Sequence, residues 1–278
     1  MTLLCNILNI NRRSYYKWLK RCSSNRYKEN EILKKTISKV YHSVNGIYGY
    51  RRITMNINSQ LKTNYNPKRI YKLMRELKLS SIIRRKKNRY IKSFTEYKAE
   101  NILNREFYSN KPLQKILTDI TEFKYGNSKL YMCATLDLYD KSILSYKLSH
   151  TANTELVLET LKSSYRGEFV SYKLLHSDRG SQFTSIEYKN TLEKLGIIHS
   201  MSRVGKCIDN GPMEGFFGNI KCEKYYLKKY KDLWELENDI HEYIKFYNNE
   251  RLQKNLNGLS PLKYREQNNI SIKNNIDN

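Results

Sequence analysis

The chain has 278 residues, with 51 Lys and Arg against 27 Asp and Glu, and its formal net charge is +24. The five cysteines are scattered and odd in number, without a Cys-x-x-Cys pair, which argues against a disulfide framework or a zinc finger. No apolar run reaches the roughly 18 residues of a membrane-spanning helix, and the first residues lack a secretion signal. We therefore expect a cytoplasmic protein with no membrane segment.

The positive charge is concentrated at the front of the chain. Residues 1–110 hold 26 Lys and Arg against six Asp and Glu, whereas residues 111–278 hold 25 against 21. An AT-rich genome would enrich Lys, Asn, Ile and Tyr everywhere, so it does not explain this asymmetry. A basic module joined to a nearly balanced one is typical of a nucleic-acid-binding protein.

The pattern of the first hundred residues is typical of helices. The pattern of residues 3–21 predicts a short apolar helix, a polar turn and a basic, aromatic helix. In a further helix, four apolar residues are predicted to share one face: Ile32, Leu33, Ile37 and Val40.

Two amphipathic helices joined by a polar turn follow. Ile53, Ile57 and Leu61 recur every four residues, and after the polar stretch KTNYN, Asn66 can cap a second helix whose first residue is Pro67. The pair is typical of a helix-turn-helix, and three basic residues of its second helix are expected to contact DNA: Lys68, Arg69 and Lys72. The alternative is a plain helical hairpin with solvated lysines.

A basic run, RRKKNR, occupies residues 84–89. Five positive charges in six residues cannot pack together in a core and suit contacts with a DNA backbone. A solvated linker is the compatible alternative. The DNA contacts predicted here are Arg84, Arg85, Lys86, Lys87 and Arg89. We assign residues 1–92 to the DNA-binding region, 93–110 to a linker, 111–270 to a second domain and 271–278 to a tail.

From residue 113 the pattern changes to strands. Three strand-like runs are followed by alternating helices and short strands, and two longer helices begin near Pro212 and Leu233. This order predicts an α/β fold of ribonuclease H type, a mixed sheet of five strands flanked by helices.

Three carboxylates lie in distinctive local sequences, which are LTDITEF for Asp119, HSDRGSQF for Asp178 and DNGPMEGFFGNIKCE for Glu214. Asp119 is predicted in the middle of an apolar strand, where an uncompensated carboxylate is costly. Asp178 ends a strand, and Glu214 falls in the first turn of a helix. Acids placed in this way can converge on two divalent metals, which suits in-line attack on phosphate.

Other acids in this part of the chain have plainer interpretations. Glu122, Asp137 and Asp140 are interpreted as ordinary turn or salt-bridge residues. Asp209 competes with Glu214 for the third position, but it precedes the helix and is better interpreted as a cap or turn residue.

Near the acids, three basic residues are candidates for phosphate contacts or equally for ordinary surface charge: Arg203, Lys206 and Lys221. Lys221 follows Glu214 by seven residues and shares its helix face. His176 precedes Asp178 by two residues, and we favour a packing role for it over a general base.

The motifs as a whole resemble a known family. TDITEF, HSDRGSQF, SRVGKCIDNGPMEGFFGNIKCE and FYNNERLQKNLNGLSPLKY are similar to the integrase core of retroviral integrases and DDE transposases, above all to the OrfB transposase of the IS-three (IS3) family of bacterial insertion sequences. YGYRRI and NPKRIYKLMRELKL resemble the helix-turn-helix of that family. The resemblance covers nearly the whole chain. Three positions depart from the usual pattern without removing an acid: Ile116, Arg179 and Gln253.

The resemblance implies a transposase that cleaves and transfers DNA strands at the ends of an insertion sequence. It implies that Asp119, Asp178 and Glu214 bind two Mg²⁺ ions, with Mn²⁺ as a substitute. The implied partners are double-stranded DNA, namely the terminal inverted repeats and the target, together with an upstream OrfA product or fusion and further copies of the chain. The alternatives are a DNA-binding regulator, an inactive relic of a transposase, or a host nuclease of the same fold.

Overall fold

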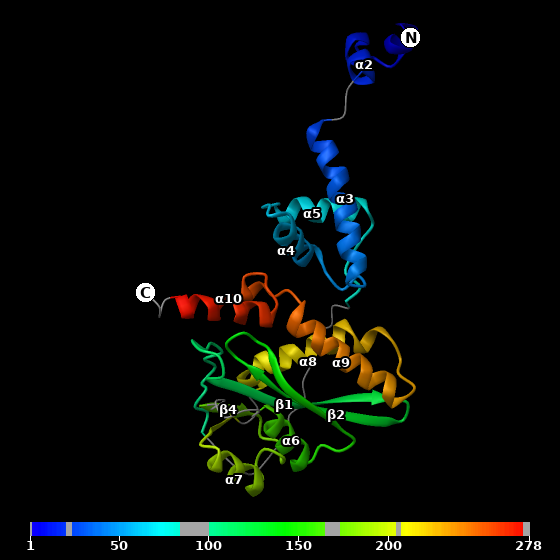
Figure 1. The fold of residues 1–278 in the computed structure, drawn as a ribbon. Coiled ribbons are helices and arrows are strands. Elements are labelled where there is room, and N and C mark those ends of the chain that lie inside the picture. The colour runs from blue at the N-terminus through cyan, green and yellow to red at the C-terminus, as the bar shows by residue number, and fades with distance from the viewer. Residues whose placement is uncertain (1, 21–23, 84–99, 165–172, 204–206, 275–278) are drawn as a thin grey trace. The chain divides into compact units, whose positions relative to one another are not determined.

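The computed structural model describes residues 2–20, 24–83, 100–164, 173–203 and 207–274, and the chain forms two compact units, Met1–Ile82 and Ile83–Asn278 (Figure 1). The predicted DNA contacts in the basic run 84–89, and Lys206, lie outside the described residues. Within the ranges given, no helix is both long enough and apolar enough to cross a membrane.

The first unit is helical, as predicted. Its helices are α1 (Thr2–Ile7), α2 (Arg12–Leu19), α3 (Asn25–Ser43), α4 (Tyr50–Leu61) and α5 (Pro67–Glu76). The predicted start of α5 is confirmed, because the Asn66 side chain accepts a hydrogen bond from the Lys68 backbone N–H at 2.8 Å and Pro67 is the first helical residue.

An apolar core holds α3, α4 and α5 together. Each helix buries its own stripe of side chains, listed in chain order: Leu33, Ile37, Val40, Ile53, Ile57, Ile70, Leu73 and Met74. Two expectations were wrong, since Ile32 is 65% and Leu61 is 46% exposed. Ile32 is one residue away from the stripe that contains Leu33 and Ile37, and this turns its side chain to solvent.

The second unit is built on a mixed sheet of five strands in the order β3-β2-β1-β4-β5. The strands are β1 (Lys115–Tyr125), β2 (Ser128–Asp137), β3 (Ile143–Ser149), β4 (Leu174–Ser177) and β5 (Ile198–Met201). The first three pair antiparallel, and β4 and β5 continue the sheet in parallel.

Helices cover both faces of this sheet (Figure 1). Leu117 and Phe123 of β1 pack with α8 (Gly211–Glu223) and α9 (Leu233–Asn249) on one side. Ile116 of the same strand packs with α6 (Thr154–Ser164) and α7 (Ile186–Lys194) on the other. Since side chains alternate along a strand, β1 is apolar on both faces. The mixed sheet flanked by helices, with a helical region before it, confirms the predicted fold class.

Buried ion pairs fasten the last helices to the sheet and to each other. Arg251, which follows α9, donates two hydrogen bonds of 2.7 Å to Glu223 at the end of α8, and both side chains are 3% exposed. Arg265 of α10 (Pro261–Asn274) binds Asp137 at 2.7 Å and also binds Asp140. The salt-bridge interpretation of Asp137 and Asp140 is therefore confirmed.

Candidate active site

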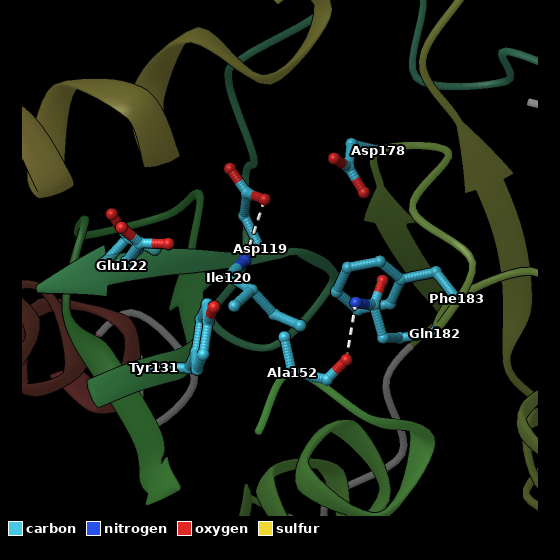
Figure 2. A pocket seen from close by; sticks show the side chains of 9 residues that line it. Asp119, Ile120, Glu122, Tyr131, Ala152, Asp178, Gln182 and Phe183 are labelled. Atoms are coloured by element: carbon cyan, nitrogen blue, oxygen red, sulfur yellow. Dashed lines mark hydrogen bonds between the residues drawn. The ribbon is translucent and has the colours of Figure 1, made fainter. Parts of the chain in front are cut away.

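Strand register places two of the three predicted acids side by side. The parallel strands β1 and β4 pair up to Leu117 and His176. Asp119 lies two positions after Leu117 on β1, and Asp178 lies two positions after His176, directly after the end of β4, so both are at the same end of this strand pair. Adjacent strands lie about 4.8 Å apart. Both carboxylates point into the same pocket (Figure 2).

This pocket has a volume of about 250 Å³. Its lining comes from β1, from the start of β2, and from the segments before α6 and after β4: Asp119, Ile120, Thr121, Glu122, Tyr131, Ala152, Asp178, Gln182 and Phe183. Glu122 is paired with Lys129 at 2.9 Å, which confirms its interpretation as a salt-bridge residue.

The surroundings of the two aspartates disfavour their charged forms. Burial raises the pKa of Asp119 well above its usual value, and the negative charges of Asp178 and Glu214 raise it further. Burial also raises the pKa of Asp178. Asp119 accepts a hydrogen bond from the Ile120 N–H at 2.8 Å and Asp178 accepts one from the Gly180 N–H at 2.9 Å, which lowers both pKa values in part. A cation between the carboxylates would stabilise their charged forms.

Glu214 lies in the first turn of α8, as predicted. Its charge acts on Asp119, and partial desolvation raises its own pKa. Among the residues that the structure describes, however, no three acidic, His or Cys side chains lie close enough to hold one metal ion. The fold thus brings Asp119 and Asp178 together and leaves Glu214 on the neighbouring helix. An all-oxygen donor set of this kind matches the preference of Mg²⁺.

Lys221 shares this side of the sheet. Its ammonium group lies 5.4 Å from the centre of the Phe123 ring on β1, and its positive charge lowers the pKa of Asp119. On the same helix, a Cβ added at Gly215 or Gly218 would meet no atom within 4 Å. The surface of α8 at these two glycines is therefore open.

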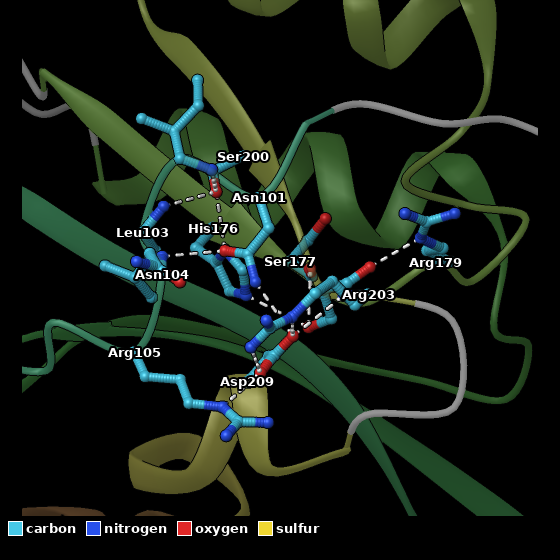
Figure 3. Close-up of polar contacts among 12 residues, drawn as sticks. Asn101, Leu103, Asn104, Arg105, His176, Ser177, Arg179, Ser200, Arg203 and Asp209 are labelled. Carbon is cyan, nitrogen blue, oxygen red and sulfur yellow. Dashed lines mark hydrogen bonds and ion pairs between the residues drawn. The ribbon is translucent and has the colours of Figure 1, made fainter.

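Arg203 is part of a charge cluster around the buried Asp209 (Figure 3). The Asp209 side chain is fully buried and accepts hydrogen bonds from Arg203 Nε and Nη2, both at 2.9 Å. Arg105 Nε and Asn101 Nδ2 also donate to it, at 2.7 and 2.9 Å. These bonds, with that from Arg203 the strongest, hold the pKa of Asp209 well below its usual range.

Sequence reasoning missed this role of Asp209. Its interpretation as a turn residue is incomplete, because the carboxylate ties the segment before β1 to the approach to α8. Arg203 lies six residues before Asp209, and this nearby opposite charge could have indicated an ion pair. Asn101 and Arg105 are about a hundred positions distant, and no local pattern connects them to Asp209.

His176 has a packing role, in agreement with the interpretation that we favoured. It is fully buried, and its ring nitrogens contact the hydroxyls of Ser200 at 2.8 Å and Ser202 at 3.1 Å. Burial lowers its pKa to about 4, so the ring is neutral at pH 7.

In the first unit, the predicted DNA contacts of α5 differ in their surroundings. Lys68 and Lys72 are exposed. Arg69 instead donates to Glu29 at 2.8 Å and to Asn30 at 3.0 Å, so its guanidinium ties α5 to α3.

Comparison with known proteins places both units in one family. Residues 109–207 and 214–268 match two models that are each described as an integrase core domain, and residues 28–87 match an HTH-like domain. The chain is 36% identical to the putative transposase InsK for insertion sequence element IS150 of Escherichia coli, over 95% of this chain and 93% of that protein. It is 31% identical to the insertion element IS600 uncharacterized 31 kDa protein of Shigella sonnei, over 95% and 98% of the two chains.

Among solved structures, the HTLV-2 integrase catalytic core domain in complex with magnesium is similar with a TM-score of 0.41 and 20% identity. That alignment covers 54% of this chain and 94% of the integrase core.

Proposed function

This chain belongs to the IS3-family transposases of bacterial insertion sequences, and we propose that Asp119, Asp178 and Glu214 support its cutting and joining of DNA strands by holding two divalent metal ions. The observation that carries the proposal is that Asp119 on β1 and Asp178 directly after β4 line one pocket, both with a raised pKa. Two carboxylates that repel each other in one pocket are stabilised by divalent cations.

Each of the three acids contributes from a different element. Asp119 stands on β1 and Asp178 directly follows β4, so the pairing of these two strands holds the two residues near each other. Glu214 comes from the first turn of α8, and its negative charge acts on Asp119, so we propose it as the third donor. When bound, Mg²⁺ or Mn²⁺ lowers the pKa of an attacking water or 3′-hydroxyl and stabilises the leaving oxygen.

The residues around the acids position the DNA strand. Lys221 lies beside β1, where its ammonium group can bind a phosphate next to the scissile bond. Arg203 keeps 46% of its side chain exposed while it holds Asp209, so its outer edge can also contact the backbone. Lys206 is proposed as a further contact from the same segment.

Double-stranded DNA is the proposed substrate, with the terminal inverted repeats of the element bound by the helix-turn-helix and the target DNA bound by the core. The HTH-like and integrase core matches support DNA binding by the two units. We further propose that the chain acts as an oligomer on DNA and together with an OrfA product or fusion.

A strand-transfer assay tests the catalytic proposal. Labelled duplexes carrying the sequences on either side of the gene are incubated with the purified chain and Mg²⁺, Mn²⁺ or EDTA. We expect nicking and end joining with either metal, none with EDTA, and none for Asp119→Asn or Glu214→Gln.

Glu122→Gln provides the matched control. Glu122 lies on the same strand as Asp119 and lines the same pocket, but it is paired with Lys129. Activity in Glu122→Gln and in Asp119→Asn alike would overturn the assignment of the acids.

A further inference from the structure

The outer face of α5 carries a continuous stripe of exposed side chains. Ile70, Leu73 and Met74 face the core of the first unit. The opposite face presents four exposed residues at helical spacing: Lys68, Tyr71, Lys72 and Arg75. Three of them are basic, and Tyr71 stands between them.

Arg69 does not belong to this stripe. Its guanidinium is held by Glu29 and Asn30 and lies over the Tyr65 ring at 5.3 Å. The positive charge that α5 presents to a partner therefore comes from the stripe itself.

The Tyr71 ring is oriented by a second aromatic residue. Its centre lies 5.2 Å from that of Tyr50 on α4, with the two planes at 61°. Tyr50 is held in turn, because its hydroxyl accepts a hydrogen bond from Arg51 Nε at 3.1 Å. Tyr71 nevertheless remains 48% exposed. An aromatic ring that is oriented in this way loses little conformational freedom on binding and presents both an apolar face and a hydroxyl.

From this geometry we infer that Tyr71 contacts base edges in the major groove and makes DNA binding by α5 sequence-specific. The inference rests on the proposed DNA partner of the first unit. An α-helix fits the major groove, where base pairs present distinct donors, acceptors and the thymine methyl group. Lysine contacts with phosphates position a helix but carry no sequence information, whereas a tyrosine ring and hydroxyl discriminate between bases.

The size of the stripe sets the expected footprint. From Lys68 to Arg75 the helix rises about 10 Å, at 1.5 Å per residue, which matches about three base pairs at 3.4 Å each. Lys68, Lys72 and Arg75 flank Tyr71 along this length and bind the backbone on either side.

Selection from a random-sequence duplex library tests the assignment. The full chain is used to enrich bound duplexes, and affinities for the enriched sequence and for a scrambled duplex are then measured over a range of salt concentrations. We expect the wild type to enrich one sequence. Tyr71→Ala should lower its preference over the scrambled duplex by about fivefold to a hundredfold, confined to about three adjacent base pairs.

Three further variants separate the roles. Lys72→Ala should weaken binding to both duplexes while the sequence preference stays, and the slope of log affinity against log salt concentration should decrease in magnitude by about one.

Tyr71→Phe retains the ring and removes the hydroxyl. It behaves as the wild type if the ring makes the contact and as Tyr71→Ala if the hydroxyl does. Tyr27, which is 57% exposed on α3, supplies the control Tyr27→Ala with unchanged preference.

An unchanged preference in a folded Tyr71→Ala, verified by circular dichroism and its melting temperature, overturns the inference. Absence of any enriched sequence for the wild type overturns it as well. The catalytic proposal is judged separately, by strand transfer in the wild type and in Asp119→Asn.

Discussion

The two units use charged residues in different ways. In the first unit an apolar core holds α3, α4 and α5, and most of the basic side chains of α5 remain on the surface. In the second unit, acids are buried in internal pairs with arginines, such as Glu223 with Arg251 and Asp209 with Arg203. Asp119 and Asp178 differ from these pairs, because their surroundings disfavour the charged forms. A raised pKa alone does not mark a cation-binding site, because burial also raises the pKa of Asp137, which is paired with Arg265. Asp119 is distinguished by the further carboxylates, Asp178 and Glu214, whose negative charges raise its pKa in addition to burial.

The largest effect is expected at the acid pair itself. Asp119→Asn should lower strand transfer by about a thousandfold or more, because several kcal/mol of metal-dependent stabilisation are lost. The same change should raise the melting temperature of the metal-free protein at pH 7. Mg²⁺ should then stabilise the wild type and not the variant.

The pH dependence of that stability follows from the raised pKa of Asp119. Below the pKa of about 3.9 that Asp119 has in the unfolded chain, the residue is protonated in both states and does not destabilise the fold. As the pH rises through the higher pKa of the folded state, Asp119 becomes charged in its buried position and the fold loses stability. The gain in Asp119→Asn should therefore vanish below about pH 4. Thermal melts in EDTA across this range measure it, and a gain that persists at pH 3 would contradict the electrostatic explanation.

Breaking a buried pair should reduce stability more than any other change discussed here. Arg251→Met leaves Glu223 charged and buried, and we expect the free energy of unfolding to fall by about 3–5 kcal/mol. Lys189→Ala breaks the exposed contact with Glu193 and should change it by less than about 0.5 kcal/mol. Urea denaturation of both variants measures the contrast. If both variants lost the same free energy of unfolding, burial would not determine how much an ion pair stabilises this protein.

An intermediate effect is expected at Asp209. Asp209→Asn retains the shape of the side chain and weakens its bonds to Arg203 and Arg105, so unfolding should become easier by about 1.5–3 kcal/mol at neutral pH. The pKa of Asp209 is lowered in the folded protein. Its ion pairs therefore stabilise the fold fully above the unfolded-state pKa of about 3.9, and this stabilisation is lost as the pH falls toward the folded-state pKa. The difference in the free energy of unfolding between wild type and variant should accordingly decrease below pH 4 in denaturation experiments. A difference that does not change with pH would contradict a contribution from the charge of Asp209.

The smallest effect sharpens the comparison within the first unit. Arg69→Ala removes the partly buried contact with Glu29, and we expect the melting temperature to fall by about 4 °C or less. The salt slope of DNA binding should remain unchanged, in contrast to Lys72→Ala. A reduced slope in Arg69→Ala would show that this side chain leaves Glu29 to bind phosphate.

Much of the fold could be predicted from local patterns. The Asn66 cap with Pro67, the four-residue spacing of Ile53 and Ile57, and the alternation of β1 all depend on residues close in sequence. The helix α10 was not predicted, and Ile32 was placed on the wrong face of α3. A shift of one position moves a side chain by about 100° around a helix, so periodicity alone assigns the edges of a stripe poorly.

The acids were identifiable from the sequence because each stands in a distinctive stretch whose secondary structure is set locally. Their mutual arrangement was not, since the pairing of β1 with β4 joins segments about sixty residues apart. The roles of Arg69 and Arg203 were likewise undetermined, because a basic residue has the same sequence signal whether it faces DNA or a carboxylate of its own chain.

The sequence by itself therefore determined most of the helices, the strands, the family resemblance and the candidate acids, all of which depend on short-range patterns. Only the tertiary structure decided which charges are paired internally and which acids share a pocket. It also decided that Tyr71 stands exposed between basic side chains. Those properties depend on contacts between distant segments, where burial and opposing charges together set whether a side chain is available to a partner.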